Sequence, residues 1–158
     1  MSNAKNIVTS KEVDIAAPAS VVWEVLTDLA RYREWNPFTV KVESTLKLNE
    51  PVDLYIPVPG QPGQEMMVRE WLVSYEPEQL LSWEQRAAGD NKDAARRDQY
   101  ITATGPATCR YVTTDIFLGI NADRIMEQFG TWVKASFDAV ADGLKQQAEK
   151  VQAARRAA

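Results

Sequence analysis

The fold is decided by residues 121–150, whose sequence is NADRIMEQFGTWVKASFDAVADGLKQQAEK. The apolar side chains of this stretch recur every three or four residues, the spacing that places them on one face of an α-helix. They are Ile125, Phe129, Trp132, Val133, Phe137, Val140 and Leu144. Charged residues, among them Asp123, Lys134 and Asp142, occupy the intervening positions. We therefore expect one helix of roughly eight turns, with a broad apolar face that must pack against a large surface.

The residues before this helix supply that surface as β-strands. From about residue 38 to residue 118, apolar and polar residues alternate, which is typical of strands with one buried face. Pro-Gly and similar turn sequences divide this region into six short-linked strands, and short links favour antiparallel neighbours. The expected strands are 38–48, 52–58, 66–75, 80–86, 95–104 and 108–118.

The N-terminal part adds one more strand and two short helices. Residues 7–16 alternate as a strand, and Pro18 suits the first position of the helix that follows. A second short helix or turn, 31–35, ends before Asn36-Pro37, because a residue before proline avoids the helical conformation. We predict an α+β fold in which a curved seven-stranded antiparallel sheet wraps around the C-terminal helix. Residues 1–158 would form a single domain with an ordered core of about 7–150, and residues 1–6 and 153–158 would be frayed ends.

Composition narrows the classes of function. A chain of 158 residues with 45% hydrophobic and 25% charged residues is typical of one globular domain. A net charge of −4 with mixed signs does not favour nucleic acid, and no apolar run reaches the ~20 residues of a membrane span. One cysteine permits no internal disulfide, so a cytoplasmic protein is expected, as a monomer or homodimer. The chain has no histidine, which excludes Ser-His-Asp triads and His-bound metals, and we expect no metal and no cofactor.

Several motifs together resemble one known superfamily. They are IAAPASVVWEVLTD at 15–28, YREWNPF at 32–38, the pair EP at 76–77 and LLSW at 80–83, and TTDIFLG at 113–119. The sequence resembles the START-like, helix-grip superfamily, also called SRPBCC, and within it the polyketide cyclase/dehydratase-like branch. This resemblance covers about residues 7–150. It implies a cavity between the sheet and the C-terminal helix for lipids, polyketides or similar ligands, but it does not imply one activity.

Two carboxylates are candidates for a polar or catalytic role in such a cavity. Asp115 shares one face of its strand with Tyr111, Thr113 and Phe117, and the resemblance implies that this face lines the cavity. A buried Asp115 would need a partner or a raised pKa; the alternative is a strand-end residue bonded to the backbone or to an arginine. Glu70 is a candidate only if its face of strand 66–75 is the inward one, which the sequence leaves open. Arg97 and Gln99 carry the same ambiguity in strand 95–104.

Aromatic and neighbouring residues are candidates for the walls of the cavity, although each also suits ordinary core packing. Trp35 and Asn36 end the short helices, near where the resemblance implies that the cavity opens, and the alternative for them is a structural plug and a helix stop. Met126 and Phe129, with the Pro57–Gln64 loop, would gate access. The complete expected ligand-binding set is Trp35, Asn36, Phe38, Trp71, Trp83, Gln99, Tyr100, Thr113, Asp115, Phe117, Met126, Phe129 and Trp132.

Three functions are consistent with these observations. The first is a protein that encloses a hydrophobic or amphipathic small molecule. The second is a cyclase/dehydratase-type enzyme, which requires a carboxylate or tyrosine in the cavity and fails if Asp115 and Glu70 both face solvent. The third is a co-chaperone-like interaction protein, which requires a filled interior and an exposed apolar patch.

Overall fold

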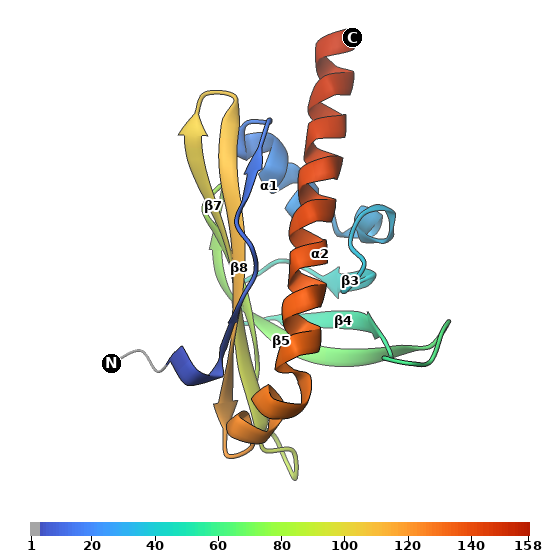
Figure 1. Ribbon diagram of the computed structural model, residues 1–158, viewed down its shortest axis with the longest axis vertical. Coiled ribbons are helices and arrows are strands. Elements are labelled where there is room, and N and C mark those ends of the chain that lie inside the picture. Colours follow the sequence, from blue (N-terminus) through green and yellow to red (C-terminus); the bar gives the residue numbers. More distant parts are fainter. Residues whose placement is uncertain (1–3) are drawn as a thin grey trace.

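An antiparallel sheet wraps around one long helix, α2 (Ala122–Ala157), in the computed structural model, which describes residues 4–158 (Figure 1). The sheet has eight strands in the order β1-β8-β7-β6-β5-β4-β3, and β2 also pairs with β8. Helix α1 (Ala19–Thr27) and the 3-10 helix η2 (Leu29–Glu34) lie between β2 and β3 in sequence. This is the α+β, helix-grip arrangement expected from the sequence. None of the helices in residues 4–158 is long and apolar enough to cross a membrane.

The strands match the expected segments with two differences. Their bounds are β1 (Ile7–Thr9), β2 (Val13–Ile15), β3 (Lys41–Ser44), β4 (Pro51–Pro57), β5 (Glu65–Glu76), β6 (Leu80–Gln85), β7 (Asp93–Gly105) and β8 (Thr108–Gly119). The expected strand 7–16 is interrupted, because the backbone N–H of Lys11 donates to Asp138 on α2 instead of to the sheet. The expected strand 38–48 is reduced to β3; at its start, Asn36 Oδ1 accepts from the N–H groups of Phe38 and Thr39 and holds them in a turn.

The ends of the chain are more structured than expected. Residues 4–6 form the short 3-10 turn η1, and the Asn6 amide donates to Asp123 at the start of α2; residues 1–3 of the expected frayed end lie outside the described residues. Helix α2 continues to Ala157 instead of fraying at Ala153. Its last turns are rich in alanine, a strong helix former, and Arg155 pairs with Glu24 of α1.

The core divides along the length of α2. In the C-terminal half, Val140, Leu144 and Ala148 are fully buried in the larger hydrophobic cluster, together with side chains of α1 and η2. Gly143 makes this packing possible, since a Cβ at that position would lie 2.2 Å from the carbonyl oxygen of Trp35. The N-terminal half meets only a smaller cluster around Phe117, Val133 and Phe137. Because α1 and η2 cover only the first of these regions, the space under the N-terminal half of α2 is left to a cavity.

Strand register decides which side chains face α2. Arg97 of β7 is paired with Asp115 of β8 on one side and with Trp83 of β6 on the other, and Trp83 is paired with Leu72 of β5. Successive side chains of a strand alternate between faces, so the inward residues of strand 66–75 include Met66, Val68, Glu70 and Leu72. Those of strand 95–104 are Ala95, Arg97, Gln99 and Ile101. Both faces that the sequence left open are thereby assigned.

Candidate functional site

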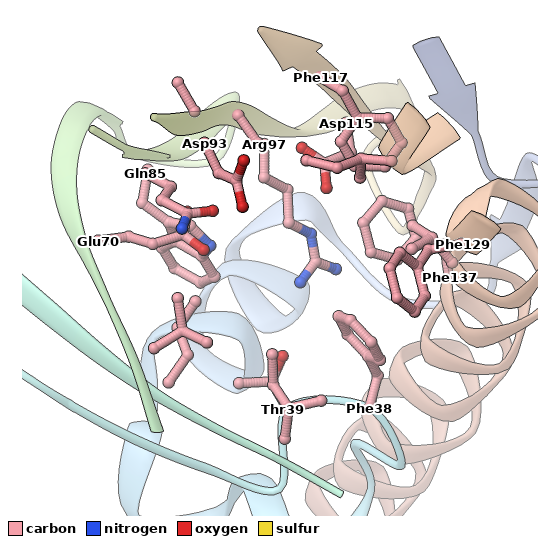
Figure 2. Close-up of a pocket in the computed structure, with 18 of the residues that line it drawn as sticks. Phe38, Thr39, Glu70, Gln85, Asp93, Arg97, Asp115, Phe117, Phe129 and Phe137 are labelled. Atoms are coloured by element: carbon pink, nitrogen blue, oxygen red, sulfur yellow. The ribbon is translucent and has the colours of Figure 1, made fainter. Parts of the chain in front are cut away.

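A cavity of about 300 Å³ lies between the inner face of the sheet and the N-terminal half of α2 (Figure 2). Helix α2 contributes one apolar wall with Ile125, Phe129, Trp132, Val133 and Phe137. Strands β4 and β5 contribute the facing wall with Leu54, Ile56, Met66 and Val68, and Phe38 contributes from the turn after η2. The volume is at the lower end of the range for small-molecule sites.

The cavity stays open because the sheet presents short or polar side chains where it passes this part of the helix. Ala95 of β7 is short, and Glu70, Gln85, Arg97 and Asp115 present polar groups to the cavity. The result is an apolar chamber with one polar wall. Such a combination is typical of sites that hold the body of a ligand by apolar contact and orient it by a few polar groups.

Arg97 is the central polar residue of this wall. Only 5% of its surface is exposed, and Figure 2 shows its guanidinium pointing into the cavity. Its Nε donates to Thr113 Oγ1 at 3.2 Å, and its charged carbon lies 4.4 Å from the centre of the Phe137 ring and 5.9 Å from that of Trp83. Its Nη2 is buried and has no hydrogen-bond partner among residues 4–158. The guanidinium is thus held at one edge and by aromatic faces, while one of its terminal nitrogens is unsatisfied.

Two acidic side chains line the cavity beside Arg97, and burial raises the pKa of both. The pKa of Glu70 rises to about 8, mainly by loss of hydration and further by the negative charge of Asp115, against the opposing effect of Arg97. The pKa of Asp115 rises to about 7 by loss of hydration, partly offset by Arg97. Both side chains keep some accessible surface, which opens onto the cavity. Asp115 Oδ1 is buried without a hydrogen-bond partner in the described part of the chain.

These three groups define the chemistry available in the cavity. Arg97 supplies a guanidinium with hydrogen-bond donors and no acceptor, whereas Glu70 and Asp115 change protonation near neutral pH. A carboxyl group with a pKa near the working pH can donate or accept a proton. The residues that the structure describes contain no cluster of three His, Cys, Asp or Glu side chains placed to hold a metal ion.

About half of the expected site residues line the cavity. The candidate carboxylate Glu70 does so, together with Phe38, Trp83, Asp115, Phe117, Phe129 and Trp132. Gln99 and Thr113 face the same side of the sheet one step further along, where the core is filled: Gln99 accepts from the Tyr111 hydroxyl and Thr113 accepts from Arg97. Met126 packs against the smaller hydrophobic cluster and is not part of the cavity wall.

Four expected site residues lie away from the cavity. Trp71 and Tyr100 are at the alternate positions of their strands and point to the outer face, where the Arg86 guanidinium covers Trp71 and Tyr100 is 38% exposed. Trp35 is buried against Tyr32 and α2, and Asn36 holds the following turn, so both have the structural roles that were weighed for them. The expected gate at Pro57–Gln64 also differs, because the β4–β5 hairpin contributes Ile56 and Met66 at its base and projects away from α2 (Figure 1).

Arg97 is the main functional candidate missing from the expected set. It lies two residues before Gln99 and therefore on the same face of the strand. The alternation that selects Gln99 as a site residue also selects Arg97. The other omitted residues are apolar or neutral wall residues such as Leu54, Val68, Gln85 and Val133. Their chemistry does not distinguish them from core residues in a sequence.

Comparison with known proteins identifies the fold and a family. The model of the polyketide cyclase/dehydrase and lipid transport family matches residues 6–149. Among solved structures, the Zhui aromatase/cyclase of a Streptomyces species is 21% identical, with a TM-score of 0.72 over 91% of this chain and 93% of that one.

Two further structures are similar in the same way. A START superfamily protein of Mycobacterium smegmatis is 16% identical, with a TM-score of 0.66 over 92% of this chain and 98% of that one. A norcoclaurine synthase of Thalictrum is 18% identical, with a TM-score of 0.63 over 92% and 95%. At these identities the likeness establishes the shared fold. No protein of curated function matches this sequence.

Proposed function

Because the chain belongs to the polyketide cyclase/dehydrase and lipid transport family, we propose that it binds an amphipathic small molecule in the cavity between the sheet and α2. One observation supports this proposal above the others: an apolar chamber of about 300 Å³ ends in a polar wall whose buried Arg97 has an unsatisfied terminal nitrogen. Buried polar groups in folded proteins normally have a partner, so an unsatisfied one facing a cavity favours a ligand that supplies it.

The apolar walls would provide most of the binding free energy. A ligand that buries about 200 Å² of apolar surface gains roughly 5 kcal/mol, before the cost of association is subtracted. The polar wall then sets the orientation of the ligand, with its polar group at Arg97 and its apolar body against Phe129, Val133 and Phe137.

The test is to identify what the protein retains. Protein purified without detergent and measured by native mass spectrometry should carry a small molecule, which extraction then identifies. Replacing Ala95 with phenylalanine fills the cavity and should abolish retention, whereas Ala103→Phe, at an exposed position of the same strand, should not. If the wild type neither retains a molecule nor binds any added amphipath, the proposal is wrong.

A proton-transferring enzyme of the cyclase/dehydratase type is the second candidate. It is favoured by the positions of Glu70 and Asp115, which both line the cavity and have pKa values raised to about 8 and about 7. An ionised carboxylate would remove a proton from the ligand, and the neutral carboxylic acid would return one. Glu70→Gln and Asp115→Asn should then keep the retained compound bound but lose its turnover; turnover unaffected in both variants would exclude this role.

The third expected function, an interaction protein without a ligand, was tied to a filled interior. The cavity under α2 does not meet that condition. It therefore receives less support than the two functions that use the cavity.

A further inference from the structure

We propose that the ligand of this cavity carries a carboxylate group, which binds the terminal nitrogens of Arg97. This inference rests on the proposed binding function and adds the chemical class of the ligand. It depends on the way the guanidinium is held, on the charges around it and on the size of the chamber.

The guanidinium of Arg97 is oriented by Thr113. The Thr113 hydroxyl donates its proton to the carbonyl oxygen of Asp98 at 2.8 Å, so that its oxygen accepts from Arg97 Nε. The Nε side of the guanidinium is thereby occupied, and its terminal nitrogens are directed into the cavity (Figure 2). Two terminal nitrogens in one plane match the two oxygens of a carboxylate, with which arginine forms paired hydrogen bonds.

No carboxylate forms a close ion pair with Arg97 in the described part of the chain. Within the described residues, none of its nitrogens lies within 4.0 Å of a carboxylate oxygen. The residues that α2 presents to the cavity are all uncharged. The rings of Phe137 and Trp83 lie 4.4 Å and 5.9 Å from the central carbon of the guanidinium, and Nη2 has no hydrogen-bond partner among the described residues. A buried cation without a partner is costly, so an anionic ligand is favoured because it would provide the partner that the protein does not supply.

The acidic residues nearby do not reverse this preference. Burial raises the pKa of Glu70 to about 8 and that of Asp115 to about 7, so near pH 6.5 Glu70 is neutral and can donate a hydrogen bond to a carboxylate. Asp93, at the cavity wall, accepts from the Asn121 amide at 2.8 Å. The other charged neighbours, Glu84 and Asp98, are paired with Arg86 and Arg96.

The buried phenols add no negative charge near neutral pH. Burial raises the pKa of Tyr32 and of Tyr111 above the ordinary tyrosine value. Arg97 is the one basic side chain among the described residues that line the cavity, so an amine would place a second cation beside it.

The size of the chamber limits the rest of the ligand. A volume of about 300 Å³ corresponds to roughly ten water-sized groups. Aromatic side chains from three directions favour a flat body over a bulky one. An aromatic acid of two fused rings, or a medium-chain fatty acid, fits these limits.

Three naphthalene derivatives with one ring system and different charges test the inference. Naphthoate, naphthylmethanol and naphthylmethylamine should be titrated into the full-length protein at about pH 6.5, with tryptophan fluorescence or calorimetry as the measurement. We expect naphthoate to bind at least tenfold more tightly than the alcohol, and the amine to bind most weakly.

Variants then locate the preference. Arg97→Met should reduce naphthoate affinity to that of the alcohol, whereas Arg110→Met, which removes an exposed arginine of β8, should leave the ratio unchanged. Thr113→Val should lower the acid-to-alcohol ratio severalfold and leave alcohol binding as it is. If the role of Thr113 were only structural, the variant would bind both the acid and the alcohol more weakly, and the ratio would not change.

The outcomes separate this inference from the proposed function. If the alcohol or the amine binds as tightly as naphthoate, the cavity binds ligands but the carboxylate inference is wrong. If none of the three binds, the carboxylate inference is wrong, whereas the binding function fails only if the wild type also retains no small molecule and binds no other amphipath. If naphthoate binds tightly and Arg97→Met does not weaken it, the assignment to Arg97 is overturned; should that variant not fold, the ranking in the wild type and the ratio in Thr113→Val decide.

Discussion

Replacing Glu70 with glutamine should make the protein less sensitive to rising pH. The Glu70 carboxyl lines the cavity, and burial raises its pKa from 4.5 to about 8, with a further contribution from the charge of Asp115. The unfolded chain releases this proton near pH 4.5, whereas the folded chain keeps it until about pH 8. Stability present below pH 4.5 is therefore lost progressively as the pH rises through this interval.

The size of the effect follows from the two pKa values. At roughly 1.4 kcal/mol per pKa unit, the full rise from 4.5 to about 8 corresponds to about 5 kcal/mol. Glu70 retains some surface that faces the cavity, so solvent there reduces the effect. We therefore expect the free energy of unfolding of Glu70→Gln, measured relative to that of the wild type, to increase by about 2–3 kcal/mol from pH 5 to pH 8. A change in stability that the glutamine side chain causes equally at every pH does not affect this difference between the two pH values.

Urea unfolding followed by tryptophan fluorescence measures the difference. Wild type and Glu70→Gln should be compared at about pH 5, 6.5 and 8, with Glu76→Gln as a control that removes an exposed carboxylate from the same strand. The free energy of unfolding of the control should differ from that of the wild type by the same amount at all three pH values. A free-energy difference between Glu70→Gln and wild type that does not change with pH would refute the burial of this carboxyl.

Gly143→Ala should lower the free energy of unfolding by about 1–3 kcal/mol in urea, because its Cβ would lie 2.2 Å from the backbone oxygen of Trp35. Gly130→Ala, where the Cβ meets only a flexible methionine side chain at 3.0 Å, should be neutral or stabilising by up to about 1 kcal/mol, and equal losses at both glycines would contradict the close approach at Trp35. Phe137→Ala should cost about 3–5 kcal/mol in the same assay, and a loss below about 1 kcal/mol would show that this fully buried ring is not part of the core. Naphthoate affinity should fall at least about fourfold between pH 6.5 and pH 8.5, because Glu70 and Asp115 both ionise in this interval and Glu70 alone accounts for about fourfold. Titrations at both pH values should find a smaller fall in Glu70→Gln, and an equal fall in both proteins would assign the effect to another group.

Much of the fold was predictable because its signals are local. The spacing of Phe129, Val133, Phe137 and Val140 identifies a helix with one apolar face, and alternation of apolar and polar residues identifies strands such as β4. The same alternation placed Asp115 and Phe117 on one face, and both line the cavity. The local signal failed at Lys11, because its N–H turns to Asp138 and divides the first strand.

The inward face of β5 shows why the site was less predictable than the fold. Met66 and Met67 are adjacent and equally apolar, as are Trp71 and Leu72, so alternation alone does not say which set is buried. Pairing with β4 and β6 places Leu72 inward opposite Trp83, and a bulge between Leu72 and Ser74 shifts the register beyond it. The inward position of Glu70 is therefore a property of the assembled sheet.

The sequence by itself determined that a sheet would grip a long C-terminal helix, because hydrophobic spacing in helices and strands depends only on neighbouring residues. The tertiary structure alone decided that Glu70, Arg97 and Asp115, from three different strands, line one chamber, and that Trp71 and Tyr100 do not. It also decided that this chamber stays open under one half of α2. Such facts depend on strand register and on how far each side chain reaches across the interior, and both are set only when segments distant in sequence pack together.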